Sequence, residues 1–305
     1  MIVSVAGGVL ILAAAVDMFH SLFHPSGRGT LSRYAIRTVW IVMRTLARRA
    51  PRLLVAAGPT GFVAAVGTWA VMLVVGWALV YWPSLPEGFV LGPGLEPGDH
   101  GSFVDALYLS LVTLGTLGYG DIAPVDPTLR ILAPLEALIG FVLLTASLAW
   151  VLSAYPALSR LRSLAEQVYI LDAEAEGDPR KMLSSLSPGE AARILSGLEA
   201  QVVHARADLS QHEIVYYFHT RDELHSLPQA LCLLHALAGC GDAPELAPDV
   251  RAAARRLQRA LTHLGNTIAA DLLARPELSA GEAFVEYAAV HPMDDRVVVR
   301  RGPRP

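Results

Sequence analysis

A glycine-rich segment near the middle of the chain is the stretch whose residue types and spacing could do chemistry. Residues 113–121 read Thr-Leu-Gly-Thr-Leu-Gly-Tyr-Gly-Asp, and the apolar residues 105–112 before them predict a short helix. The segment is too short and too polar to cross a bilayer itself. If it lies between two membrane spans, its non-helical backbone must be buried in protein or line a water-filled path. We therefore infer that residues 113–121 line a water-filled path across the membrane.

The composition supports membrane spans on both sides of this segment. Of the 305 residues 53% are hydrophobic and only 17% are charged, whereas soluble chains carry about 25% charged residues. No charged residue occurs from 53 to 86, and only Glu136 from 131 to 159. A purely soluble protein and a disordered one are both excluded. The formal net charge of −4 gives no indication of nucleic-acid binding.

Three segments are long enough to cross the hydrocarbon core, which takes about 20 apolar residues. They are residues 2–19, 60–82 and 129–155. Ala13-Ala14-Ala15 resembles a signal-peptide cleavage site, but no basic residue precedes Arg28, so a retained span is favoured over a cleaved signal.

Loop charges predict the orientation of the spans. Residues 20–58 contain seven arginines and no acid, whereas residues 83–129 contain six acids and no lysine or arginine up to position 129. The positive-inside rule places the first loop in the cytoplasm and the second outside. We therefore expect the N-terminus outside and the chain after residue 155 in the cytoplasm.

The basic stretch 31–49 predicts a helix that lies in the inner membrane interface and does not cross it. Pro51 and the pair Gly58-Pro59 are expected to break the chain before the second span. The arginines that share one face of this helix are Arg33, Arg37, Arg44 and Arg48.

The order span, short helix, Thr-Leu-Gly-Tyr-Gly-Asp, span resembles the two-span pore unit of the potassium channel family. The alternative is a chance turn, against which the flanking spans, the short helix and the helix-start signal Pro124 argue. The resemblance implies a selectivity filter over 116–121, composed of Thr116, Leu117, Gly118, Tyr119, Gly120 and Asp121.

The same resemblance implies how that filter works. Four chains around an axis would replace the water of K⁺ with carbonyl oxygens. The carbonyls are those of Thr116, Leu117, Gly118 and Tyr119, joined by the Thr116 hydroxyl. Turning successive carbonyls the same way needs alternating left- and right-handed backbone, for which Gly118 and Gly120 are suited. Tyr119 would point away from the axis. One filter strand per chain implies a homotetramer.

The sequence departs from the family pattern around the filter. Gly115-Thr116 stands in place of two threonines, and Leu117 replaces the commoner valine or isoleucine. Val112 and Leu109 occupy positions where some members carry a glutamate and a tryptophan. Tyr108 is placed to share a hydrogen bond with Asp121. We expect K⁺ selectivity to survive and filter stability to differ, with Tyr108, Val112 and Thr113 as filter support.

Four features of the spans are candidates for gating, each with a structural alternative. Gly140 is either a hinge or a close packing contact. Glu136 is either a functional ionisable group or a buried carboxyl with a hydrogen-bond partner. Asp17, near the end of the first span, is either a functional ionisable group or a residue that faces the inner headgroups. The leucines spaced by four, which either line the cavity or face lipid, are Leu144, Leu148 and Leu152.

The cytoplasmic half predicts an all-helical domain over residues 156–290, followed by a disordered tail over 291–305. Pro156 is expected to end the inner helix of the pore, and residues 157–174 are expected to continue as a polar helix. Capping boxes at Ser187–Glu190 and Ser279–Glu282 mark helix starts, and apolar residues at helical spacing cover 191–209, 228–238 and 248–274. Apart from Val297–Val299 no run alternates as strands do, which argues against a Rossmann-type sensor or a cyclic-nucleotide β-roll.

This half also carries a group of metal-ligand residue types: His204, His212, His219, His225, Cys232, His235 and Cys240. Their spacing matches no standard zinc site, so dispersed histidines are the favoured interpretation. Proton sensing by these histidines is a further hypothesis, because histidine titrates near neutral pH. The group could also serve a cytoplasmic ligand that the sequence does not identify.

Together these features predict an all-α membrane protein with a re-entrant pore loop between two spans and an extra N-terminal span. The expected segments are an N-terminal span (1–20), a basic helix (21–58), a pore domain (59–155) with its pore helix at 103–114, the helical domain and the tail. The predicted function is a homotetrameric, bacterial K⁺ channel in the cell membrane, with lipid contacts, no enzymatic activity and no cofactor besides the permeant ion. The alternative is a membrane-anchored sensor or scaffold whose pore loop does not conduct.

Overall fold

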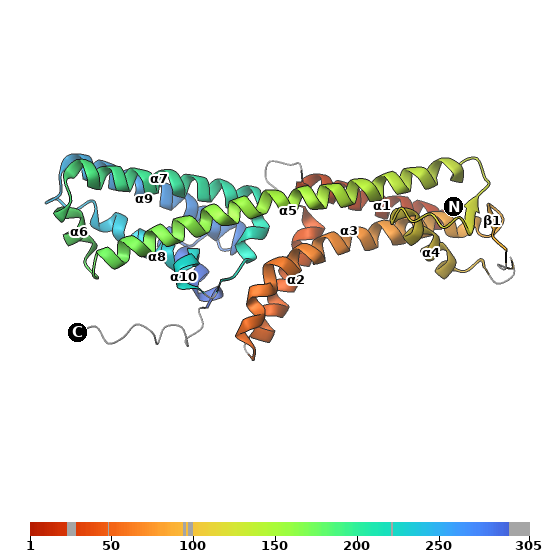
Figure 1. Ribbon diagram of the computed structural model, residues 1–305, viewed down its shortest axis with the longest axis horizontal. Coiled ribbons are helices and arrows are strands. Elements are labelled where there is room, and N and C mark those ends of the chain that lie inside the picture. The colour runs from red at the N-terminus through yellow and green to blue at the C-terminus, as the bar shows by residue number, and fades with distance from the viewer. Residues whose placement is uncertain (23–28, 48, 94–95, 97–99, 221, 293–305) are drawn as a thin grey trace. The chain divides into compact units, whose positions relative to one another are not determined.

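The computed structural model describes residues 1–22, 29–47, 49–93, 96, 100–220 and 222–292. The chain forms two compact units, residues 1–39 with 60–152 and residues 40–59 with 153–305, and each is described by itself. Apart from one short pair of strands, the described elements are helical (Figure 1). Three of the described helical stretches, residues 2–22, 52–84 and 129–174, are long and apolar enough to cross a membrane. The predicted all-α fold class is confirmed.

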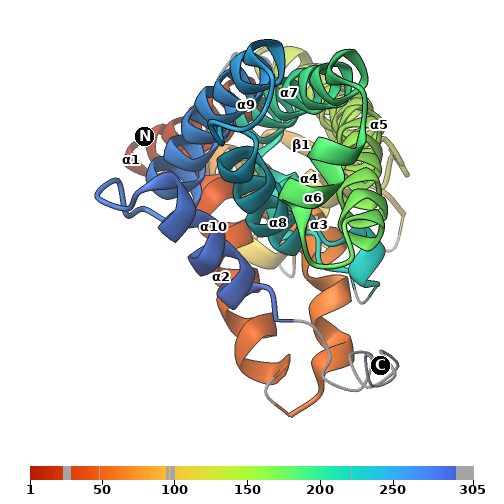
Figure 2. The ribbon, with the colours of Figure 1, turned by 90° about the vertical axis from the view of Figure 1, so that its left-hand side faces the viewer.

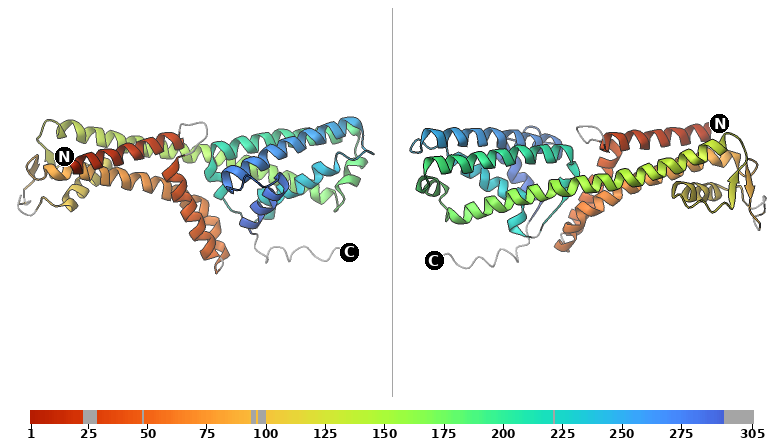
Figure 3. Two further views of the ribbon diagram at one scale, coloured as in Figure 1. Left: turned by 180° about the vertical axis from the view of Figure 1, so that it is seen from behind. Right: turned by 45° about the horizontal axis from the view of Figure 1, so that its top comes forward.

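In the first unit, helix α1 (Ile2–Leu22) packs along α3 (Ala57–Tyr81) through two glycines (Figure 3). A Cβ on Gly7 would lie 2.4 Å from the Gly76 carbonyl oxygen, and one on Gly76 would lie 2.7 Å from Ile11 Cγ1. Small residues at a crossing let helix backbones approach closely in a membrane. The N-terminal helix is therefore fitted to α3.

Asp17 joins α1 to two other helices of this unit. Its side chain is buried, and its carboxylate accepts hydrogen bonds from Trp69 Nε1 of α3 at 2.8 Å, Leu31 N at 2.8 Å and Ser32 N at 3.0 Å. The last two are free N–H groups in the first turn of α2 (Thr30–Ala47). The interpretation in which Asp17 faces the headgroups was wrong, because these donors hold it inside the protein.

The basic segment is helical as predicted, but α3 begins earlier than expected. In α2, Arg37 and Arg44 are exposed whereas Ile36 and Trp40 are buried; Arg48 lies outside the described residues. A short 3-10 turn, η1 (Pro51–Ala56), follows, and α3 includes Gly58 and Pro59. The predicted break there was wrong, since proline in the first turn of a helix has no N–H that needs a partner.

The segment between α3 and the next long helix contains α4 (Phe103–Leu114), whose bounds match those predicted for the pore helix. Ser102 caps it, because its side chain accepts from Asp105 N while the Asp105 carboxylate accepts from Ser102 N at 2.9 Å. The loop before it contains the turn η2 (Trp82–Ser84). Strand β1 (Phe89–Leu91) pairs antiparallel with β2 (Ile122–Pro124), with Val90 opposite Ala123. The sequence analysis did not predict these strands.

Helix α5 (Leu129–Glu174) runs for 46 residues and continues through Pro156. The helix predicted over 157–174 is present, but it is continuous with residues 129–155, so the expectation that Pro156 ends the inner helix was wrong. Proline removes one backbone hydrogen bond, but the residues that follow bury an apolar face: Ala157, Leu161, Leu164, Ala165 and Val168. Tertiary packing of such a face contributes more to helix stability than a single bond.

The second unit is a bundle of helices around the end of α5 (Figure 2). Helices α7 and α9 lie side by side and bury leucines such as Leu195 and Leu261. Among the described residues of this unit no strand occurs. The elements are α6 (Pro179–Ser185), α7 (Pro188–Gln211), the turns η3 (Glu213–Tyr217) and η4 (Glu223–His225), α8 (Leu227–Cys240), α9 (Pro248–Thr267), the π-turn η5 (Ile268–Leu272) and α10 (Ala280–Val290).

The predicted caps are present to different degrees. Ser279 and Glu282 form the complete reciprocal box at the start of α10. Ser187 accepts from Glu190 N at 3.3 Å, which is half of the predicted box. His291, the first residue of the predicted tail, is buried, so the folded unit extends at least that far. The rest of the predicted tail from 293 onward, with Val297–Val299, lies outside the described residues.

Replacing Asp17 by asparagine should destabilise the chain, because the amide has one acceptor oxygen where three N–H donors need partners. We expect the free energy of unfolding in detergent to fall by about 2–4 kcal/mol, from unmade buried hydrogen bonds. Thermal unfolding followed by circular dichroism measures the change. Asp172→Asn, at a half-exposed position of α5, is the control; equal stability of the two variants would contradict the assigned role of Asp17.

Candidate functional site

The segment after α4 has an alternating backbone. Thr116, Gly118 and Gly120 have φ values of +56°, +55° and +77°, whereas Leu117 and Tyr119 between them do not have positive φ. Positive φ at Gly118 and Gly120 agrees with the prediction. Positive φ at Thr116 was not expected, since residues with a Cβ seldom adopt it and it costs conformational energy.

The amides of this segment are held by the end of α4. Thr116 N donates to Thr113 O at 2.9 Å, and Leu117 N donates to Val112 O at 2.9 Å. Gly118 N also lies 3.4 Å from Val112 O. Val112 and Thr113 were predicted to support the filter, and it is their backbone carbonyls that accept these hydrogen bonds. Their side-chain types do not reveal this role.

The carbonyl oxygens of this segment are left without partners. Within the part of the chain that the structure describes, the carbonyls of Thr116, Leu117, Gly118 and Tyr119 accept no hydrogen bond. Residues 115–120 are exposed in the single chain, with Tyr119 67% exposed. The segment therefore offers unpaired carbonyl oxygens, which are suited to a cation.

Asp121 ties the end of the segment to the surrounding loop. Tyr108 of α4 donates its hydroxyl hydrogen to Asp121 Oδ2 at 2.5 Å, so the predicted pair is present, with the tyrosine as donor. Gly92 N donates to Asp121 O at 2.7 Å. Both ends of residues 116–121 are thus anchored to neighbouring elements.

The Glu136 side chain lies inside the protein and not in solvent. Its side chain is fully buried, and its carboxylate accepts from Tyr81 Oη of α3 at 2.6 Å and from Ser110 Oγ of α4 at 2.5 Å. The structure therefore favours the buried-carboxyl interpretation over a gating role. Sequence reasoning missed Ser110, whose place on the buried side of the pore helix was the available signal.

Gly140 gives α5 a close approach to the end of the pore helix. A Cβ at this position would lie 2.0 Å from the Leu114 carbonyl oxygen, and α5 is continuous there. This contact favours the packing interpretation. The predicted row of leucines is exposed in the single chain, so cavity lining and lipid contact both stay open; it consists of Leu144, Leu148 and Leu152.

The histidines and cysteines of the second unit do not gather into one site. No group of three metal-binding side chains is found among the described residues. His204 is exposed, whereas burial lowers the pKa of His212 and raises that of the Cys232 thiol. The His219 ring centroid lies 6.2 Å from that of His291, and His225 pairs with Asp222. His235 contacts Phe284, and Cys240 ends α8.

His291 is a buried histidine that the sequence analysis placed in the tail. Its Nε2 lies 2.9 Å from Tyr216 O and its Nδ1 3.1 Å from Tyr287 O. Burial lowers its pKa to about 3, so the ring is neutral at physiological pH. Its ring centroid lies 4.7 Å from that of Trp40. The apolar helical spacing up to Val290 was a signal that folded structure continues to this point.

The chain is similar in sequence to several known proteins. Residues 63–155 match a family described as ion channel. An uncharacterised membrane protein of Bacillus subtilis, YdjJ, is 28% identical over 168 residues, which are 55% of this chain and 48% of that protein. The inward rectifier potassium channel Kirbac3.1 of Paramagnetospirillum magnetotacticum is 29% identical over 127 residues, 41% of each chain. Two-pore potassium channel 5 of Arabidopsis thaliana is 55% identical over 38 residues, 12% of this chain and 9% of that one.

The matched region is the one that contains α4, the 116–121 segment and the spans around it. The chain spans about half or less of the length of these curated relatives. No solved structure matches it. Residues 63–155 are therefore similar in sequence to ion channels, and two of the relatives that the chain resembles are named as potassium channels.

Replacing Glu136 by alanine should destabilise the pore region, because the hydroxyls of Tyr81 and Ser110 would lose their acceptor inside the protein. Each unsatisfied buried group costs about 1–3 kcal/mol, which should lower the unfolding temperature in detergent. Leu138→Ala, at a position 57% exposed on the same helix, is the control. If both variants unfold at the temperature of the unmodified chain, Glu136 does not brace the loop.

Acidification should destabilise the second unit through His291. The unfolded chain has a histidine pKa of about 6.5, whereas the folded pKa is about 3, so between these values the unfolded state binds more protons. This group's contribution to the free energy of unfolding therefore falls by about 2 kcal/mol from pH 7 to pH 5. Chemical denaturation of the chain at both pH values measures it.

The variant His291→Gln removes the titrating group and should flatten that pH dependence, although its stability at pH 7 is lower. His204→Gln, at an exposed position, should keep the slope of the unmodified chain. An unchanged slope in His291→Gln would contradict the prediction.

Proposed function

We propose that the protein is a K⁺-selective channel whose filter is Thr116–Asp121. The observation that carries the proposal is the row of carbonyls at 116–119 that accept no hydrogen bond in the described structure. Potassium filters replace the hydration shell of the ion with backbone carbonyls. The likeness of residues 63–155 to ion channels, and of the chain to proteins named as potassium channels, supports the choice of ion.

The proposal includes a homotetramer. One chain contributes a single row of carbonyls, and a ring of such rows around an axis is needed to surround an ion. Residues 115–120 are exposed in the single chain, although irregular backbone at membrane depth must be covered by protein or face water. Copies of the chain would cover Tyr119 on one side and leave the carbonyls to a central path.

The orientation follows from charge. Arg33, Arg37 and Arg44 belong on the cytoplasmic side by the positive-inside rule, and Glu87, Asp105 and Asp126 on the outer side. An acidic outer mouth raises the local concentration of cations. The second unit then lies in the cytoplasm, where it assembles or gates the pore, because α5 runs unbroken from residue 129 into it.

Ion flux in liposomes tests this function. The purified chain should pass K⁺ down its gradient, and the reversal potential should follow K⁺ and not Na⁺. A folded oligomer that carries no flux would contradict the channel and favour a membrane-anchored sensor or scaffold.

Gly118→Ala should abolish the preference for K⁺ over Na⁺. A Cβ on Gly118 meets nothing within 4 Å, so the penalty is conformational: φ is +55°, and this region costs an L-residue about 1–2 kcal/mol. Gly67→Ala, a helical glycine of α3 with equally open surroundings, is the matched control and should keep selectivity. Unchanged selectivity in Gly118→Ala would overturn the filter assignment.

A further inference from the structure

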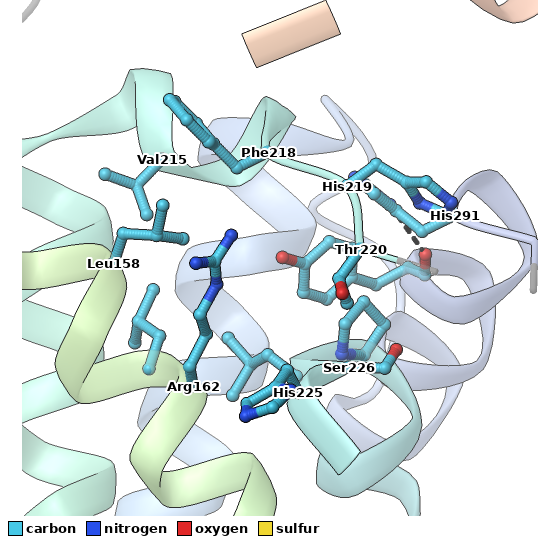
Figure 4. Close-up of a pocket in the computed structure, with 13 residues that line it drawn as sticks. Leu158, Arg162, Val215, Phe218, His219, Thr220, His225, Ser226 and His291 are labelled. Atoms are coloured by element: carbon cyan, nitrogen blue, oxygen red, sulfur yellow. Dashed lines mark hydrogen bonds between the residues drawn. The ribbon is translucent and has the colours of Figure 1, made fainter. Parts of the chain in front are cut away.

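The second unit contains a pocket formed by α5, the segment from η3 to α8, and α10 (Figure 4). Its cavity volume is about 30 Å³, and the pocket is partly open to solvent. Leu158, Val215 and Phe218 form an apolar wall, and the Arg162 side chain extends from α5 into the space beside them (Figure 4). The lining residues with hydrogen-bonding side chains are Arg162, His219, Thr220, His225, Ser226 and Tyr287.

The described residues that line the pocket carry positive charge and no negative charge. None of the described residues that line it is an aspartate or a glutamate, whereas Arg162 is permanently charged. Two acids close in sequence to the lining are engaged elsewhere: Asp222 accepts from His225 Nδ1 at 2.8 Å, and Glu286 forms an ion pair with Arg275 at 3.6 Å. Among the described residues Arg162 has no ion-pair or hydrogen-bond partner. Arg160, two residues earlier, is by contrast paired with Asp208 through two hydrogen bonds.

Helix α8 begins at the wall of this pocket. Ser226, Leu227 and Pro228 line it, and no side chain caps the first turn. The Ser226 hydroxyl donates to Gln229 Oε1 instead of accepting a backbone N–H. The positive end of the helix dipole therefore adds to the charge of Arg162.

We propose that this pocket binds a phosphate group, with Arg162 as its principal ligand. The guanidinium presents two parallel N–H donors to phosphate oxygens, and the hydroxyls of Thr220 and Tyr287 and the first turn of α8 supply further donors. A phosphate has enough oxygens to accept from all of them, which favours it over a carboxylate. The source is either a free phosphate compound or a lipid headgroup.

The site has a consequence that rests on the proposed channel function. Leu158, Leu161 and Arg162 belong to α5, the same helix whose earlier residues form the proposed inner helix of the pore. A phosphate held between Arg162 and α8 would therefore restrain the end of α5 against α8 within the second unit. The bound group would change K⁺ flux by acting on this helix.

Binding is measured first, without any requirement for conduction. The full chain in a phosphate-free detergent is titrated by calorimetry with inorganic phosphate, with glycerol 3-phosphate and with a short-chain phosphatidylglycerol kept below its micelle concentration. Binding of the first two indicates a free phosphate compound, and binding of the lipid alone indicates a headgroup. Arg162→Gln should weaken binding about tenfold or more, and Arg162→Lys less, because it keeps the charge without the fork.

Arg206→Gln, at an exposed position of α7 outside the pocket, is the control and should bind like the unmodified chain. The site is overturned if none of the probes binds, or if Arg162→Gln binds as tightly as the control. Flux of the unmodified chain in liposomes, with and without the probe that binds, tests the second step. Probe binding with unchanged K⁺ flux overturns the regulatory role alone, whereas absence of any flux bears on the channel function and leaves the phosphate site standing.

Discussion

In the proposed channel the lipid interior offers no hydrogen bonds, and this constraint governs residues 63–155. Every peptide group placed there needs a partner from the protein, from water or from an ion. The amides of Thr116 and Leu117 find theirs at the end of α4, but the carbonyls from Thr116 to Tyr119 find none among the described residues. A row of unpaired oxygens at membrane depth is stable only beside a cation or a water-filled path. The channel interpretation follows from this imbalance more than from any side chain.

The remaining contacts of the first unit hold that backbone in place. Glu136 binds hydroxyls from α3 and α4, so one carboxylate fixes the pore helix against both spans. Gly140 lets α5 reach the Leu114 carbonyl, directly before the alternating segment. Asp17 likewise links α1 to α3 and α2, because it accepts hydrogen bonds from Trp69 and from two backbone amides of α2. Asp17 and Glu136, which the sequence analysis considered for the headgroups or for gating, therefore hold helices together inside the protein.

The sequence predicted what depends on local pattern, and it failed where distant contacts decide. The bounds of α4 and positive φ at Gly118 and Gly120 follow from apolar runs and from glycine, and both were predictable. The roles of Asp17 and Glu136 depend on donors far along the chain, such as Trp69 and Tyr81, which no spacing reveals. Continuity of α5 through Pro156 depends on the packing of Leu161 and Leu164. His291 was assigned to a tail because one of the two carbonyls that it contacts, that of Tyr216, lies 75 residues earlier in the chain.

Direct observation of ions in the filter tests the central claim most sharply. Crystals of the protein grown in Rb⁺ in place of K⁺ would give an anomalous signal wherever the ion is ordered. The account predicts peaks on a fourfold axis, level with the carbonyls of Thr116, Leu117, Gly118 and Tyr119 from four chains. An ordered filter segment with no anomalous density between the chains, or with its carbonyls paired to protein donors, would contradict it.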